Sequence, residues 1–319
     1  MSKNEKPEQV AVVGLGLLGR GIAACLLGRG LHVVGVETGA DQLAKARAEI
    51  QTMMDELVDL GGADAGLRDE WHGRYTGTTD FAALRESVFI VESVTEDAAV
   101  KNQVMDAIES VAGEQVVIAS NTSAIPISLL QRGRKHPGRF VGMHWASPAH
   151  ATRFMEIIRG EQTTDEAVAA TAEMARRLGK DPCPCQRDMP GFIVNRIAYA
   201  MYREALNLLE SGMADAETID AAVRNGLGLW ASLCGPLRWI DISGGPELYA
   251  KAMSRVLPTL SKADAVPAPL QELADANARG TINGRGFYSY TDEEARRWED
   301  LYRLHAWRIV RMQNENAAT

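Results

Sequence analysis

Short apolar segments recur through the first half of the chain, and longer segments of mixed polarity separate them. Each is four residues long, and the six are Val10–Val13, Val33–Val36, Val88–Val91, Val116–Ala119, Phe140–Met143 and Met155–Ile158. Near-continuous apolar runs of this length are typical of strands that are covered on both faces. We therefore expect these segments to be strands in the interior of one sheet.

The segments between these runs have helical periodicity. Asp41–Leu60 and Lys101–Val111 place apolar residues at intervals of three and four. Thr163 and Glu166 have the spacing of a capping box at the start of another helix, and Gly179 is placed to end it. Strands that alternate with helices in this way predict an α/β fold with a Rossmann-type, doubly wound parallel sheet.

Beyond Gly191 the strand-like runs stop. Apolar residues then fall at helical intervals, at Val194, Ile197, Ala198, Met201, Ala205, Leu208 and Leu209. Thr291 and Glu294 form a second capping-box pattern, which predicts that the last helix begins there. We expect a Rossmann domain over residues 1–188 and an all-helical C-terminal domain over residues 189–319.

A glycine-rich loop follows the first predicted strand and precedes a predicted helix. Its G-x-G-x-x-G sequence is Gly14, Leu15, Gly16, Leu17, Leu18 and Gly19. In this motif the first glycine allows the tight turn, the second lets the backbone approach a pyrophosphate, and the third allows close packing of helix on sheet. The N-terminus of the helix then offers free N–H groups to the phosphates. The loop predicts a dinucleotide site.

An acidic residue at the end of the second predicted strand sharpens this prediction. Glu37 directly follows Val33–Val36, where a carboxylate can accept hydrogen bonds from both ribose hydroxyls and repel a 2′-phosphate. We therefore expect NAD rather than NADP. A methyltransferase can also combine a glycine-rich loop with an acidic strand end, but the polar residues described below favour a dehydrogenase.

The composition narrows the class of partner. With 34 basic and 42 acidic side chains the formal net charge is −8, which disfavours binding to nucleic acid or to an anionic membrane surface. The longest apolar stretch, residues 10–28, is interrupted by Arg20 and by several glycines, so it does not predict a membrane-spanning helix. A small-molecule ligand is favoured instead.

The four cysteines show no disulfide spacing, which favours a reduced, cytoplasmic protein over a secreted one. Cys183 and Cys185 flank a proline, but no second cysteine or histidine pair lies near them in the sequence. We therefore predict no metal site.

Polar residues interrupt or follow the later apolar runs at four places. They are the segment Ser120–Ser123, His144 at a strand end, Glu156 inside a strand-like run, and Asn195 at the start of the helical region. Together with Gly14–Gly19, with Pro190–Arg196 and with Gly284–Tyr290, this spacing resembles the 3-hydroxyacyl-CoA dehydrogenase family over nearly the whole chain.

The resemblance implies NAD-dependent oxidation of a 3-hydroxyacyl-CoA to the 3-ketoacyl-CoA in a homodimer, and a catalytic set of Ser123, His144, Glu156 and Asn195. Imidazole is the side chain that needs least tuning to act as a base near neutral pH. In these roles His144 takes the hydroxyl proton, and Glu156 orients the imidazole and stabilises the imidazolium. Ser123 and Asn195 would hydrogen-bond the substrate oxygen as its charge changes.

The same resemblance assigns further cofactor contacts, and two positions depart from the family pattern. The additional residues expected to bind NAD are Glu92, Glu96, Asn121 and Ser147. Ser147 stands where the family has an asparagine, and Ala99 stands where a lysine is expected. A serine still forms hydrogen bonds but reaches less far.

Residues 41–70 bear on the identity of the substrate, because they contain eight acidic and only three basic side chains. Such a segment is a poor partner for the phosphates of coenzyme A. The family's lambda-crystallin, L-gulonate 3-dehydrogenase and carnitine dehydrogenase branches suggest an alternative substrate, a free 3-hydroxy acid. The candidates to bind its carboxylate are Arg153, Arg196, Arg224 and Arg238. A non-catalytic NAD-binding protein is a second alternative.

Overall fold

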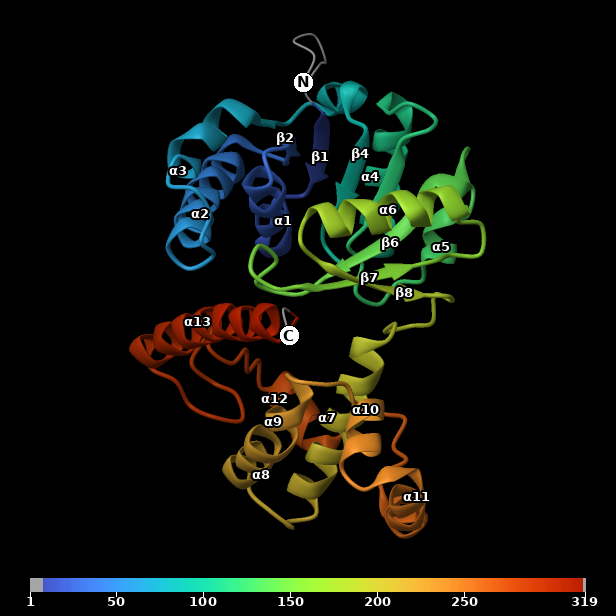
Figure 1. Ribbon diagram of the computed structural model, residues 1–319, viewed down its shortest axis with the longest axis vertical. Helices are drawn as coiled ribbons and strands as arrows, with labels where there is room; N and C mark the ends of the chain where they lie inside the picture. The colour runs from blue at the N-terminus through green and yellow to red at the C-terminus, as the bar shows by residue number, and fades with distance from the viewer. Residues whose placement is uncertain (1–7, 318–319) are drawn as a thin grey trace. The chain divides into compact units, whose positions relative to one another are not determined.

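The structure, a computed structural model, describes residues 8–317 and divides into two compact units between Asn195 and Arg196 (Figure 1). The first unit is the α/β fold that the apolar runs predicted. The second is helical, and its described residues form isolated β-bridges but no β-strand. The sequence thus predicted the fold class correctly.

One sheet of eight strands organises the first unit, in the order β3-β2-β1-β4-β5-β6-β7-β8. The strands are β1 (Gln9–Val13), β2 (His32–Val36), β3 (Tyr75–Thr78), β4 (Phe89–Glu92), β5 (Val117–Ser120), β6 (Phe140–Trp145), β7 (Phe154–Ile158) and β8 (Asp181–Cys185). All neighbours are parallel except β6 and β7. The strand order changes direction between β1 and β4, since the sheet extends from β1 to β2 and β3 on one side and from β4 to β8 on the other. Sheets of this kind bind dinucleotides at that switch point.

The two edge strands were not predicted. In β8, Pro182 and Pro184 remove two backbone N–H donors, and in β3 the short sequence Tyr75–Thr78 is mostly polar. Proline is tolerated in a strand only where its missing N–H is not needed by a neighbour, which is at a sheet edge. These strands form because a partner strand lies beside them, and their own sequences do not reveal this.

Helices cover both faces of the sheet. On one face α1 (Leu17–Gly28), α2 (Ala40–Asp59) and α6 (Asp165–Arg177) bury their apolar sides, together with the short α3 (Leu67–Glu70). On the other face lie α4 (Ala98–Val111) and α5 (Ile127–Gln131). The strands contribute alternate residues to these two cores, such as Val10 to the first and Ala11 to the second. Because both faces are covered, the strands read as continuous apolar runs.

The start of α6 differs from the prediction by one residue. The cap is Thr164, whose hydroxyl accepts a hydrogen bond from the Ala167 N–H, and not Thr163. The Thr163 hydroxyl instead donates to the Phe140 carbonyl at 2.7 Å. Two adjacent threonines can both cap, and burial of Thr163 beside β6 decides between them.

The first helix of the second unit is the long α7 (Val194–Glu210), which begins two residues before the boundary. Its other helices are α8 (Ala216–Ala222), the π-helix Val223–Leu227, α9 (Gly228–Ala231), α10 (Pro236–Ile242), α11 (Gly245–Val256), α12 (Ala268–Asp275) and α13 (Asp292–Ala317). The Thr291 N–H donates to the Glu294 carboxylate at 2.8 Å, and the Glu294 N–H donates to the Thr291 hydroxyl at 3.2 Å. The predicted capping box at the start of α13 is therefore confirmed. Among the described residues no helix has the length and apolar content needed to cross a membrane.

Candidate active site

The glycine-rich loop joins β1 to α1 at the carboxyl end of the sheet. Gly14 has φ +89°, and a Cβ there would lie 2.7 Å from the Ser93 carbonyl oxygen. A Cβ on Gly19 would lie 1.8 Å from the Gly14 carbonyl oxygen. A Cβ on Gly16, by contrast, would meet no atom within 4 Å. The loop is therefore closed at its two ends and open at Gly16, as a phosphate cradle requires.

The surroundings of the loop suit a dinucleotide. Gly16 precedes α1 without a side-chain cap, so the first N–H groups of this helix face the open side of the loop. Glu37 lies beside the loop at the end of β2, and its Oε2 accepts a hydrogen bond from the Leu15 N–H at 2.8 Å. The Leu15 side chain is buried and that of Leu17 is exposed. Leu18 is partly buried against the core. The residues present fit NAD.

His144 and Glu156 form a cross-strand pair between β6 and β7. His144 Nδ1 lies 2.7 Å from Glu156 Oε2, and both side chains are buried. His144 Nε2 has no hydrogen-bond partner within the described part of the chain. The antiparallel pairing places the two side chains on one face of the sheet, so the imidazole is held at one nitrogen and available at the other.

The second oxygen of Glu156 is held by the backbone. Oε1 accepts hydrogen bonds from the N–H groups of Ile193 and Val194, each at 2.9 Å. Burial raises the pKa of Glu156, but the hydrogen bond to His144 and those from Val194 and Ile193 outweigh it, so the pKa lies below its usual value. Glu156 is therefore an anion at neutral pH, which suits it to stabilise a cationic imidazole.

The turn that carries Ser123 meets Asn195. Asn195 Nδ2 donates to the Ser123 carbonyl oxygen at 3.1 Å, and Ser123 itself is exposed. Glu96 Oε1 holds the same turn by accepting from the Thr122 hydroxyl at 2.6 Å and from the N–H groups of Ser123 and Ala124 at 2.9 Å. Burial raises the pKa of Glu96, but these bonds and the nearby Lys101 ammonium lower it overall. In this structure Glu96 orders the Ser123 turn.

Glu92, expected to contact NAD, is instead completely buried under the site. Its Oε1 accepts from Lys101 Nζ at 2.8 Å and from the Val94 N–H at 2.7 Å, and its Oε2 accepts from the Ser120 hydroxyl at 2.5 Å. A carboxylate enclosed in this way positions the loop after β4. The contact of Glu92 with NAD stays a prediction.

Lys101 was missed by the sequence interpretation, which expected the lysine of this segment at Ala99. Lys101 is completely buried and also lies 3.4 Å from Glu96 Oε2. A sequence signal existed, because Lys101, Met105 and Ile108 share the buried side of α4. A lysine at an apolar position of an amphipathic helix indicates a buried anion nearby.

Asn121 and Ser147 lie near the end of β6. Asn121 Nδ2 donates to the Ser93 hydroxyl, and its Oδ1 accepts from the Trp145 N–H, both at 3.0 Å. Asn121 thereby links the glycine-loop side of the sheet to the strand of His144. Ser147 is partly buried in the loop between β6 and β7. Their predicted contacts with NAD stay predictions.

Cys183 is paired with Glu156 in the register of β7 and β8 and is exposed. Burial and the nearby Glu156 carboxylate raise the pKa of the Cys183 thiol, and they raise that of Cys185 to about 12. Both sulfurs are therefore protonated thiols at neutral pH, which disfavours a redox or nucleophilic role.

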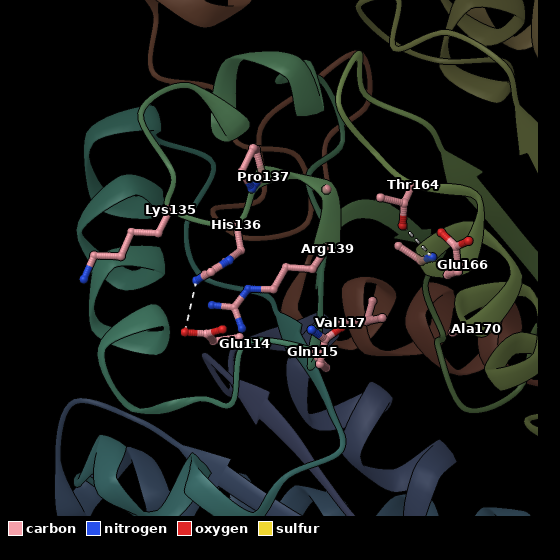
Figure 2. A pocket seen from close by; sticks show the side chains of 12 residues that line it. Glu114, Gln115, Val117, Lys135, His136, Pro137, Arg139, Thr164, Glu166 and Ala170 are labelled. Atoms are coloured by element: carbon pink, nitrogen blue, oxygen red, sulfur yellow. Dashed lines mark hydrogen bonds and ion pairs between the residues drawn. The ribbon is translucent and has the colours of Figure 1, made fainter.

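A cavity of about 500 Å³ lies away from these residues, at the amino ends of β5 and β6 (Figure 2). Lys135, His136 and Arg139 line it together with Glu114, whose carboxylate is 3.6 Å from His136 Nε2. In sheets of this kind ligands bind beyond the carboxyl ends of the strands. The cavity is therefore separate from the candidate active site.

Comparison with known proteins agrees with this arrangement. Residues 9–189 match the family model described as "3-hydroxyacyl-CoA dehydrogenase, NAD binding domain", and residues 191–290 match "3-hydroxyacyl-CoA dehydrogenase, C-terminal domain". The chain is 34% identical over 290 residues to a 5-formyl-3-hydroxy-2-methylpyridine 4-carboxylate 5-dehydrogenase of Mesorhizobium japonicum, which covers 90% of this chain and 92% of that protein. It is 33% identical to the fatty acid oxidation complex subunit alpha of Acinetobacter baylyi, of which it spans 39%.

Solved structures show the same relationship. A crystal structure of a 5-formyl-3-hydroxy-2-methylpyridine 4-carboxylic acid 5-dehydrogenase, described as an NAD⁺-dependent dismutase, has a TM-score of 0.88 and 32% identity and covers 97% of this chain and 98% of its own. The (S)-3-hydroxybutyryl-CoA dehydrogenase of Ralstonia eutropha has a TM-score of 0.75 and 32% identity, and the match covers 90% of this chain and 100% of that chain. This chain therefore belongs to the 3-hydroxyacyl-CoA dehydrogenase family, and it is an NAD-dependent oxidoreductase that acts on CH–OH groups.

Proposed function

We propose that this protein oxidises a small carboxylate bearing a secondary alcohol or a hydrated aldehyde, with His144 as the general base and without coenzyme A on the substrate. The observation that carries the base is the 2.7 Å contact between His144 Nδ1 and a buried Glu156 whose other oxygen is already held by two N–H groups. This leaves His144 Nε2 as the atom that meets the substrate.

In the proposed reaction His144 Nε2 takes the proton of the substrate hydroxyl. Glu156 keeps Nδ1 protonated and stabilises the positive charge that the ring acquires. NAD, when bound, accepts the hydride from the same carbon. We propose that Ser123 and Asn195 hydrogen-bond the oxygen as it becomes a carbonyl. The hydrogen bond from Asn195 Nδ2 to the Ser123 carbonyl oxygen at 3.1 Å, which brings the two residues together, supports this role.

The variant His144→Gln tests the base directly. A glutamine approximates the size of the imidazole but cannot take a proton, so we expect NADH formation to fall by about 10³–10⁴-fold. Affinity for NADH, measured by fluorescence quenching, should stay within about twofold of the parent, because His144 is not part of the glycine-rich loop. Retained turnover would contradict the role of His144, and binding without any turnover in the parent would favour the non-catalytic alternative.

The pairing of basic residues in the segment from α2 to β3 supports a substrate without coenzyme A. Arg68 forms salt bridges with Asp55 at 2.8 Å and with Asp59 at 2.6 Å. Arg47 contacts His72 Nδ1 at 3.0 Å, and its guanidinium lies 5.3 Å from the ring centre of Trp71. The third basic residue, Lys45, is exposed beside Glu49. The segment therefore presents mostly negative charge, which repels a ligand with several phosphates.

One of the relatives favours the same class of substrate. The relative that matches over nine tenths of both chains is named for a pyridine carboxylate that carries a formyl group, which is a compact substrate without coenzyme A. Arg153 is unsuited to bind the carboxylate because Asp181 already pairs with it at 2.7 Å. Arg196, Arg224 and Arg238 are exposed residues of the second unit and stay candidates.

Steady-state assays of NADH formation separate the substrates. The panel is 3-hydroxybutyryl-CoA, L-gulonate, carnitine and 5-formyl-3-hydroxy-2-methylpyridine 4-carboxylate, at equal enzyme and NAD concentrations. We expect kcat/KM to be at least about 100-fold higher for one of the three free acids than for the thioester, which corresponds to about 2.7 kcal/mol. A higher value for the thioester would contradict this proposal and restore a 3-hydroxyacyl-CoA substrate.

We infer further that the second unit binds substrate and forms a homodimer. Its first helix, α7, has no buried residue, and Val194, Ile197 and Met201, which share one face of this helix, are 39%, 56% and 36% exposed. Apolar side chains on one helix face are usually covered by another surface. Sedimentation equilibrium at micromolar concentration should give twice the chain mass, and Ile197→Asp should shift the protein towards monomer. A monomeric parent protein would contradict the inference.

A further inference from the structure

The turn before α7 has an unusual backbone beside the candidate base. Gly191 has φ +79° and Phe192 has φ +51°, so two consecutive residues adopt the left-handed conformation. Within residues 8–317 the only other non-glycine residue with positive φ is Asn277, at +54°. Asparagine tolerates this conformation, whereas a bulky residue such as phenylalanine rarely adopts it. Strain of this kind persists only where the surrounding structure requires it.

The backbone of this turn holds the Glu156 carboxylate. The Phe192 N–H donates to the Met189 carbonyl oxygen at 2.9 Å, which closes the turn. The next two N–H groups, of Ile193 and Val194, then both reach Glu156 Oε1 at 2.9 Å. Successive N–H groups that converge in this way form an anion-binding concavity. An extended conformation at Phe192 would turn these two donors away from the carboxylate.

The side chain of the same residue confines the imidazole. Phe192 is 3% exposed, and its ring centre lies 5.7 Å from that of His144 at an interplanar angle of 59°. Phe154 packs edge-on against the imidazole at 5.8 Å and 89°. The hydrogen bond to Glu156 restrains one atom of the ring of His144, and the two aromatic contacts restrain its rotation.

We propose that Phe192 is a positioning residue for the His144–Glu156 pair. Its left-handed backbone directs two N–H groups to Glu156, and its ring limits the rotation of His144. Phe192 acts through these two residues and does not contact the reacting atoms. The effect on turnover rests on the proposed role of His144 as the base, whereas the effect on Glu156 does not.

Three substitutions separate the two contributions. Phe192→Gly and Phe192→Asn permit the left-handed backbone but remove the ring. Phe192→Val also removes the ring, and because valine is β-branched it disfavours positive φ as well. Because two ring-deleting variants are available, failure of one to fold leaves the other to carry the test.

Two measurements are made on each variant. The first is kcat at saturating NAD, together with the KM for NAD. The second is a carbon NMR titration of the Glu156 carboxyl in the protein without ligands, assigned by its loss in Glu156→Gln. The ring-deleting variants should lower kcat by about 10–100-fold, with the KM for NAD and the Glu156 titration unchanged. Phe192→Val should in addition raise the pKa of Glu156, because its N–H donors are lost.

Asn277→Val is the matched control, because it also places a β-branched residue at a position with positive φ, but in the second unit. We expect this control to leave kcat and the Glu156 titration unchanged. A kcat within twofold of the parent in the ring-deleting variants would overturn the role of the ring, and an unchanged Glu156 titration in Phe192→Val would overturn the role of the backbone. Activity in His144→Gln would instead refute the proposed function, whatever the Phe192 variants show.

Discussion

Two buried carboxylates near the carboxyl end of the sheet, Glu92 and Glu156, are held in similar ways but have different capacities. Each is completely buried, and each accepts hydrogen bonds from the backbone and from one basic side chain. The partner of Glu92 is Lys101, whose ammonium is enclosed by Glu92, Glu96 and the Val94 carbonyl. The partner of Glu156 is His144, which has a second nitrogen. Burial and ion pairing are common to both sites, and an available proton acceptor belongs to only one.

Lys101→Met should have the largest effect on stability. Removing the ammonium leaves the Glu92 charge buried without its partner, which costs about 3–5 kcal/mol in free energy of unfolding. The measurement is urea denaturation followed by circular dichroism. The double variant Glu92→Gln with Lys101→Met should be more stable than Lys101→Met alone, because the completely buried Glu92 charge is then removed together with its partner. An unchanged urea midpoint in the single variant would show that the ion pair does not support the fold.

Glu156→Gln should have the largest effect on turnover after loss of the base itself. A carboxamide retains the shape but not the charge that stabilises the imidazolium, so we expect kcat to fall by about 10²–10³-fold. The KM for NAD should change by less than about twofold. If Glu156→Gln lost stability as Lys101→Met does while keeping its kcat, the proposed difference between the two carboxylates would be wrong.

Lys180→Met probes another buried ionisable group, which lies between α6 and β8 and donates to the loop that joins the strands of His144 and Glu156. Lys180 Nζ donates to the Ala149 carbonyl oxygen at 2.6 Å and to that of Thr152, and it lies 5.2 Å from the ring centre of Trp145. Burial lowers the pKa of Lys180. Loss of its donors leaves two carbonyls without this partner, which should cost about 1–3 kcal/mol in free energy of unfolding.

Lys180→Arg is the control for Lys180→Met, since it keeps the charge and the donors, and it should recover part of the loss in urea denaturation. Equal losses in the two variants would indicate that the volume at this position matters and that the hydrogen bonds do not.

The pH dependence of stability should show the smallest effect. The pKa of Glu156 is lower in the folded protein than its usual value of 4.5, so the unfolded chain binds the proton more readily. The stabilisation from Glu156 is therefore fully present above pH 4.5 and is lost as the pH falls through the folded pKa. Each unit of lowering corresponds to about 1.4 kcal/mol. Urea midpoints at pH 6 and pH 3.5 should differ less in Glu156→Gln than in the parent, and equal differences would contradict this assignment.

Local sequence signals were sufficient for several features. The spacing of Gly14, Gly16 and Gly19 after an apolar run identified the dinucleotide loop, because its geometry depends on residues that are adjacent in the chain. The period of the apolar positions identified the six interior strands and the helical second unit. The capping box at Thr291 and Glu294 was also readable from spacing alone.

Other features depend on residues brought together from distant parts of the chain. The prolines of β8 hid a strand that exists only because β7 supplies its partner. Glu92 was expected to bind the cofactor, and the position of Lys101 on the apolar side of a helix indicates only that some anion is near; the tertiary structure shows that the two form an internal ion pair. The left-handed conformation of Phe192 contradicts the local preference of phenylalanine, so no sequence rule predicts it.

The sequence by itself therefore determined the fold class, the cofactor and the residue types available for catalysis, since periodicity and glycine spacing act over a few residues. The tertiary structure decided which of those residues are buried and which of them hold one another. Burial makes an unpaired charge so costly that each buried ionisable group must find its partner wherever the fold places one. For this reason Glu92 and Glu156, equally plausible as site residues in the sequence, have different parts in the folded protein.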